Sequence, residues 1–229
     1  MKVAVMQPYL FPYIGYFQLI SAAQVFIGYN DVQFIRRGYI NRNRLQHTEF
    51  TVPLRAAPRD TTIEHRVIDQ KQWERWLKKW RTGLAHSYAR APFYREMRDL
   101  TERVWEGPTE RIDELARKSL FEVCRYIELP FPYFRASDLD YDRSLRGQDR
   151  MIDLLRTVDC STYVNMIGGR ELYEREKFAR NEMELRFLRP TLDFGDAKYR
   201  FDLSILHLLA YHDPTTCRQL ILQNYELIR

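Results

Sequence analysis

The first 29 residues constrain the fold more than any other part of the chain. Residues 2–6 form a short apolar run, and Pro8 ends it, as expected for a buried strand. A helix follows at Gly15, with apolar side chains at 17, 19 and 20, and residues 25–29 predict a second strand. Strand, helix and strand in this order form the first unit of a parallel sheet, so we expect an α/β fold.

The rest of the chain extends this pattern and adds two elaborations. Strands are predicted at 133–136, 163–167 and 185–188, and helices at 150–158, 202–209 and 215–227. Residues 49–54 and 63–68 predict two short strands of an antiparallel flap. A helical insertion, about 72–130, has Trp73, Trp76, Leu77 and Trp80 at helical spacing, which indicates core packing. No linker composition flanks it, so we expect one domain, 1–229, with a mostly parallel Rossmann-like sheet.

Composition narrows the class of protein. A chain of 229 residues can bury a sizeable hydrophobic core and does not need disulfides or a structural metal for stability. Its three cysteines are scattered and match neither a metal site nor a disulfide framework, and no histidine pair has metal spacing, so we expect buried thiols and no bound metal. No membrane span or secretory signal is apparent, which favours the cytoplasm. The oligomeric state stays open.

The turn after the first strand is the first candidate site. Gln7, Tyr9, Gly15 and Tyr16 lie between a strand end and a helix start, where backbone N–H groups bind anions. The spacing is similar to the first turn of nucleotidylyltransferase-like folds, in which a histidine usually follows the glycine; Tyr16 has that place here. The alternative is that the prolines and aromatic residues only brace the turn.

The second strand is also followed by polar residues, Asn30, Asp31 and Gln33. We expect Gln7 and Asp31 to face one cleft at the carboxyl ends of adjacent strands. Asp31 is a candidate for orienting an amine, and Arg36 or Arg37 could fold back over its carboxylate. A turn or helix cap is the alternative role. Gly168 and Gly169 follow a later strand, where they either approach a phosphate or form a plain turn.

A basic segment, residues 34–48, contains no acidic residue. Arginine makes up 29 of the 36 basic residues, and the net charge is +5, which favours an anionic partner. Basic side chains interleaved with amides suit contact with phosphates; the alternative is a solvated face. The candidate phosphate-binding residues here are Arg36, Arg37, Asn41, Arg42, Asn43 and Arg44. Further along, Ser204 and His207 share a predicted helix face, where His207 is a candidate base and core packing is the alternative.

Three blocks of sequence together resemble the WbqC-like protein family. They are residues 6–17, from Met6-Gln7-Pro8-Tyr9 to Gly15-Tyr16-Phe17; residues 29–34, Tyr-Asn-Asp-Val-Gln-Phe; and residues 40–43, Ile-Asn-Arg-Asn. The stretches 163–173 and 203–205 are also similar. The family commonly has Asp-Asp where this chain has Asn30-Asp31, and often an aspartate where it has His207.

The resemblance implies an enzyme that attaches an acyl or aminoacyl group to an amino sugar in surface-polysaccharide (O-antigen) biosynthesis. We therefore expect a group transferase that uses an activated acyl or aminoacyl donor and an amino-sugar nucleotide, with Asp31, Gln7 and His207 as candidate catalytic residues. One alternative is aminoacyl transfer to a modified base in DNA, of the kind found in phage hypermodification. The other is a non-catalytic nucleotide- or nucleic-acid-binding module.

Overall fold

A computed structural model describes residues 1–107, 109–192 and 200–229 of the chain. Its centre is a six-stranded sheet in the order β5-β2-β1-β6-β7-β8. The strands are β1 (Lys2–Met6), β2 (Val25–Gly28), β5 (Tyr133–Arg135), β6 (Thr162–Met166), β7 (Glu184–Pro190) and β8 (Tyr225–Ile228). All neighbouring pairs are parallel except β7 with β8. The predicted α/β fold with a mostly parallel sheet is confirmed.

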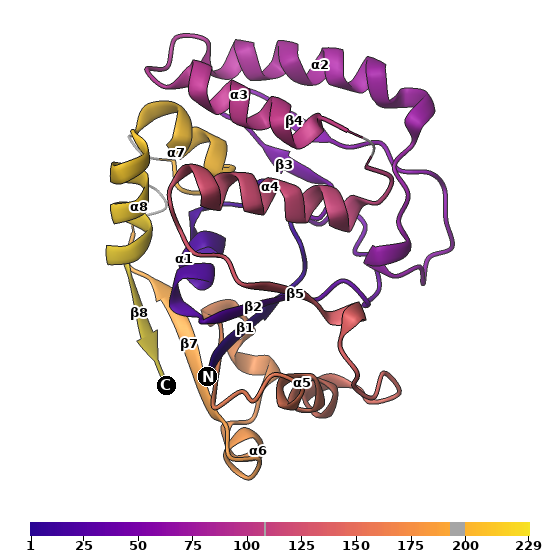
Figure 1. The fold of residues 1–229 in the computed structure, drawn as a ribbon, viewed down its shortest axis with the longest axis vertical. Coiled ribbons are helices and arrows are strands. Elements are labelled where there is room, and N and C mark those ends of the chain that lie inside the picture. The colour runs from indigo at the N-terminus through magenta and orange to yellow at the C-terminus, as the bar shows by residue number, and fades with distance from the viewer. Residues whose placement is uncertain (108, 193–199) are drawn as a thin grey trace.

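Helices cover both faces of this sheet (Figure 1). On one face, Ala4, Phe26 and Val164 pack with α1 (Ile14–Ala22), α7 (Ile205–Tyr211), α8 (Pro214–Gln223) and the helical insertion. On the other, Val3 and Val5 pack with α5 (Gly147–Arg156) and α6 (Arg175–Ala179). Successive residues of β1 enter opposite cores because side chains alternate along a strand, which explains why the strand is apolar throughout.

The insertion is helical, as predicted, and consists of α2 (Gln70–Tyr88), α3 (Tyr94–Trp105) and α4 (Ile112–Tyr126). Trp80 and Trp105 are buried in contact, with ring centroids 5.3 Å apart, and Trp73 and Trp76 pack against the same core. The tryptophan pattern therefore marks core, as predicted. Cys124, Cys160 and Cys217 are all free and buried, which agrees with the expectation of reduced thiols.

A small antiparallel flap is present as predicted, but its two strands differ from the expected pair 49–54 and 63–68. The flap joins β3 (Arg42–Arg44) to β4 (Glu49–Thr51), so one of its strands comes from the basic segment. Residues 63–65 instead form a short 3₁₀ helix, η1 (Ile63–His65), and a single antiparallel bridge links Leu54 to Ile68. The amide side chain of Asn41 donates to the carbonyl of Val52 at 2.8 Å, a tertiary contact that strand propensity does not encode.

The end of the chain also differs from the prediction of one helix over 215–227. Helix α8 ends at Gln223, and Tyr225–Ile228 form β8 at the edge of the sheet. The carbonyl of Asn224 accepts hydrogen bonds from Gln18 Nε2 at 2.8 Å and from the backbone N–H of Thr191 at 3.0 Å. These contacts from distant elements accompany the end of the helix, so a local reading of the sequence misses it.

Candidate functional site

The loops that leave β1 and its neighbour β6 run to opposite sides of the sheet. From β1 the chain crosses α1 to β2 on one side, while β6 pairs with β1 in parallel on the other. At such a topological switch point the loops after the two strands separate and leave a crevice at the carboxyl edge, where open α/β sheets bind ligands. Here the two loops follow β1 and β6, and the second contains the 3₁₀ helix η3 (Ile167–Leu172).

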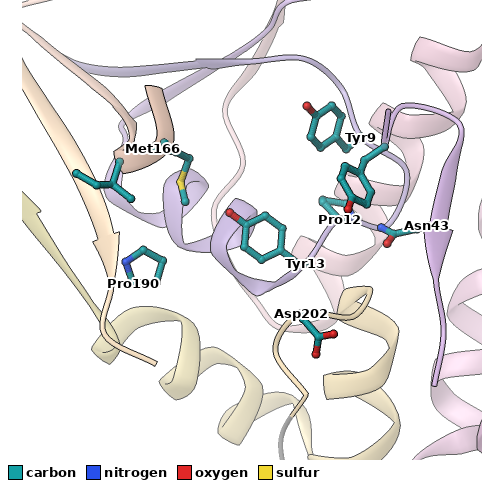
Figure 2. Close-up of a pocket in the computed structure, with 10 residues that line it drawn as sticks. Tyr9, Pro12, Tyr13, Asn43, Met166, Pro190 and Asp202 are labelled. Atoms are coloured by element: carbon teal, nitrogen blue, oxygen red, sulfur yellow. The ribbon is translucent and has the colours of Figure 1, made fainter. Parts of the chain in front are cut away.

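Two adjoining hollows of about 420 and 490 Å³ occupy this crevice. We call them together the switch-point cleft; the residues that line both hollows are Tyr9, Tyr13, Tyr39, Met166 and Gly168. Figure 2 shows Tyr9, Tyr13, Met166, Pro190 and Asp202 around the first hollow. Each volume suits a small-molecule ligand.

Tyrosine side chains dominate the walls of the cleft. Burial raises the pKa of Tyr13 and of Tyr29 to about 12, and it raises the pKa of Tyr16 well above its ordinary value. The phenols therefore stay neutral near pH 7, where they act as hydrogen-bond partners and aromatic surfaces and not as bases. Tyr39 is 53% exposed and lines the opening.

Amide side chains and a pair of glycines contribute to the polar part of the cleft. Gln7 lies at the end of β1, and Asn165 lies on β6. A Cβ atom at Gly169 would lie only 2.6 Å from the amide nitrogen of Asn165, so any larger residue there would require the Asn165 side chain to move. Gly168 has open space where a side chain would project, which leaves its backbone accessible from the cleft.

Asp202 is the only carboxylate among the lining residues that the structure describes. Its two oxygens accept from Arg200 at 3.0 and 3.2 Å, and this hydrogen bonding lowers the pKa of Asp202. It therefore carries a negative charge at neutral pH. The sequence analysis did not identify Asp202 as a site residue. The one feature that could have indicated it is its position two residues before Ser204, which caps helix α7.

The loop between β1 and α1 is held by three other elements at Phe11. The Phe11 carbonyl accepts from Asn43 Nδ2 at 2.7 Å and from Ser204 Oγ at 2.8 Å. Its N–H donates to Ser119 Oγ at 3.1 Å. Phe11 has a φ of 44°, a strained value for a side chain of its size, which these contacts stabilise. The cleft wall is therefore fixed by β3, α4 and the start of α7.

Six predicted site residues line the cleft: Gln7, Tyr9, Tyr16, Asn43, Gly168 and Gly169. Gly15 does not, because it lies against the ring of Tyr13, 2.5 Å from the position of a Cβ atom. The cleft also contains Tyr13, Tyr29, Tyr39 and Asn165, which were not predicted as site residues. They come from the loop after β1, the end of β2, the basic segment and β6.

Asp31 follows β2, as expected, but its carboxylate lies outside the lining of the cleft. It accepts from Tyr141 at 2.6 Å and from Arg143 at 3.1 Å, and it pairs with Arg150 at 3.3 Å. Arg143 and Arg150 are thus the cations beside it, in place of Arg36 or Arg37. The Arg150 guanidinium also lies over the ring of Tyr29, 5.4 Å from its centroid, which connects Asp31 to the cleft wall.

Asn30 and Gln33 make contacts within the protein. The Asn30 side chain is fully buried and bonds to Asp113 at 3.0 Å and to Ser137 at 3.0 and 3.1 Å. Gln33 donates to the carbonyl of Arg59 at 2.8 Å. These bonds tie the end of β2 to α4, to the turn after β5 and to the loop before η1.

His207 is buried in α7 against Tyr88, with ring centroids 5.8 Å apart, and it does not line the cleft. Burial, followed by the positive charge of Arg200, lowers its pKa to about 4, so it is neutral at pH 7. The hydroxyl of Ser204 donates to Phe11 and accepts from the N–H of Leu206 at 3.4 Å, capping α7. The two residues therefore make separate contacts and no dyad.

The basic segment contributes to a further hollow, of about 460 Å³, which we call the arginine hollow. Its lining includes the predicted residues Arg36, Arg37, Asn41 and Arg42, together with Arg55 and Arg66. None of its lining residues belongs to the switch-point cleft. Arg44 lies on β3 and lines neither site.

Metal-binding clusters are absent from residues 1–107, 109–192 and 200–229: no three His, Cys, Asp or Glu side chains there could hold an ion together. Within the same ranges, no helix combines the length and the apolar character needed to cross a membrane.

Comparison with known proteins shows the family of the chain. "Uncharacterized protein Rv1507c" of Mycobacterium tuberculosis is 27% identical over 191 residues, which cover 81% of this chain and 80% of that relative. No solved structure matches the chain. The model of the WbqC-like protein family matches residues 7–219, which include the loops and strand ends that build the switch-point cleft. The chain belongs to the WbqC-like protein family.

Proposed function

We propose that the protein is a group transferase that places an acyl or aminoacyl group on an amine or hydroxyl of an amino-sugar nucleotide. The observation that carries the proposal is the switch-point cleft, a tyrosine-lined site at the carboxyl ends of β1 and β6. Aromatic walls hold sugar and base rings, and phenols and amides bond to their hydroxyl and carbonyl groups. Membership of the family supports a biosynthetic transferase role.

The groups in the cleft suit the charges of such a transfer. The acceptor amine or hydroxyl attacks the acyl carbonyl, and the leaving group departs with the electrons of its bond and takes up the proton that the acceptor loses. The negative charge of Asp202 orients the amine and stabilises the positive charge that develops on it. The amides of Gln7 and Asn165 and the backbone N–H groups near Gly168 are candidate donors to the carbonyl oxygen. Asp31 positions Tyr29 through Arg150.

The test supplies a UDP-linked amino sugar with acyl-CoA or aminoacyl-tRNA donors and measures product by mass spectrometry. We expect Asp202→Asn to lower turnover at least ~100-fold, because it removes the charge that orients the amine and stabilises the positive charge developing on it. We expect Tyr39→Ala to weaken binding of the UDP-sugar by about tenfold or more, as loss of a ring contact does. Asp60→Asn and Phe121→Ala are the matched controls, since both side chains are exposed and outside the cleft.

Three results would contradict the proposal. Unchanged binding in Tyr39→Ala and unchanged turnover in Asp202→Asn would place the reaction elsewhere. Product only on an oligonucleotide with a modified pyrimidine would favour the DNA-base alternative. Binding of the UDP-sugar without product from any donor would favour a non-catalytic module.

A further inference from the structure

The arginine hollow concentrates positive charge without neutralising it. Five arginines line it: Arg36, Arg37, Arg42, Arg55 and Arg66. No acidic side chain is among its described lining residues, and none of the five forms an ion pair with a carboxylate in the described ranges. The sequence separates these arginines by up to 30 positions, so the fold and not one basic run gathers them.

Arg66 shows that the arrangement is unfavourable without a partner. Its pKa is lowered, first by burial and then by the positive charge of Arg36. Lowering the pKa of a guanidinium means that its charged form is destabilised there. An anion in the hollow would reverse this effect, because opposite charge stabilises the guanidinium.

The geometry of Arg66 adds a second observation. The guanidinium lies over the ring of Phe34, 4.9 Å from its centroid, and Nη2 donates to the carbonyl of Arg55 at 3.1 Å. Its buried Nε atom has no hydrogen-bond partner in the part of the chain that the structure describes. A buried N–H without a partner is unfavourable, so contacts within the described residues leave this guanidinium incompletely satisfied.

We propose that the arginine hollow is a binding site for a diphosphate group, separate from the switch-point cleft. Five cations exceed what one phosphate neutralises, and the planar forks of arginine match phosphate oxygens. The hollow has the volume of a small-ligand pocket. Because the two sites share no lining residue, this proposal does not depend on the proposed transferase reaction.

The test is calorimetric titration of the whole protein with inorganic pyrophosphate. We expect binding that Arg36→Ala/Arg55→Ala weakens at least about tenfold, the effect of losing a charge-assisted hydrogen bond. Both side chains are exposed, so the double variant should fold. Arg66→Lys keeps the charge but loses the fork, and it should also weaken binding. Arg90→Ala/Arg59→Ala is the control, since it removes two exposed charges that do not line the hollow.

Each outcome decides the matter. Loss of affinity in the hollow variants, with affinity retained in the control pair, supports the site. Equal loss of affinity in both pairs would mean that pyrophosphate binding depends only on net charge, and it would overturn the proposal. The absence of binding at low ionic strength would also overturn it. A single-stranded oligonucleotide that binds with a steep salt dependence and is not displaced by pyrophosphate also overturns it, in favour of a nucleic-acid surface.

Discussion

Asp31 shows how one carboxylate can look catalytic in the sequence and be held structurally in the fold. Its side chain is only 3% exposed and contacts Arg143, Arg150 and Tyr141. We predict that Asp31→Asn lowers the free energy of unfolding by about 3 kcal/mol, because breaking a buried pair leaves the arginines without their counter-charge. Urea unfolding followed by circular dichroism measures this loss.

The control for that measurement is Asp60→Asn, an exposed site that should change stability by no more than about 0.5 kcal/mol. If Asp31→Asn is as stable as the control, the carboxylate is not a structural partner of the arginines. Its proposed effect on Tyr29 would then lose its basis.

Part of the site could be predicted residue by residue, and part could not. Gln7, Tyr9 and Tyr16 were found because they follow a strand that is apolar enough to recognise. Two partners of Asp31, Tyr141 and Arg143, lie in the polar segment between β5 and α5, and the third, Arg150, lies in α5. Arg55 and Arg66 reach the arginine hollow only because the chain folds back there. Contacts of this kind depend on tertiary structure, which local pattern does not specify.

At the scale of elements, the apolar strands and the amphipathic helices were predictable, and the polar strands were not. β1 and β2 are apolar runs that end in turns, so burial alone identifies them. β3 has the sequence Arg-Asn-Arg, which has little strand preference, and β8 continues directly from α8 with no glycine or proline between them. Both are stabilised by pairing with a partner strand.

Helix α7 packs into the core through a neutral histidine, His207, so we expect the stability of the protein to depend on pH. The pKa of His207 is about 4 in the fold, below the ordinary value of 6.5, so the unfolded chain takes up the proton first as the pH falls. Stability is therefore retained above about pH 6.5 and lost as the pH falls towards 4. From pH 7 to pH 5 we expect His207 to account for a loss of about 2 kcal/mol.

Unfolding of the wild type and of His207→Leu at the two pH values measures this contribution. The leucine variant should lose less stability between pH 7 and pH 5, whereas His47→Gln, at an exposed position, should behave like the wild type. Equal pH dependence in all three proteins would mean that the docked helix accommodates the charged histidine.

At the scale of the whole molecule, the insertion and the sheet share one hydrophobic core. Leu100, Val104 and Leu120 of the insertion belong to the same buried cluster as Ala4 and Phe26 of the sheet. The first loop is bound to α4 through Phe11 and Ser119, so the wall of the switch-point cleft depends on the insertion. Elements that share a core are expected to unfold together.

The tryptophans make this expectation measurable. All four tryptophans of the chain lie in the insertion, so their fluorescence reports only that part, while amide hydrogen exchange of β1 and β6 reports the sheet. We predict that the two probes give one transition in urea. Leu100→Ala should lower the stability seen by both by roughly 2–5 kcal/mol, since it empties a fully buried position. Leu222→Ala, 42% exposed on α8, should shift neither by more than about 0.5 kcal/mol. If the fluorescence transition comes at lower urea while β1 and β6 stay protected, the insertion is a domain of its own, and the cleft wall loses a support before the sheet unfolds.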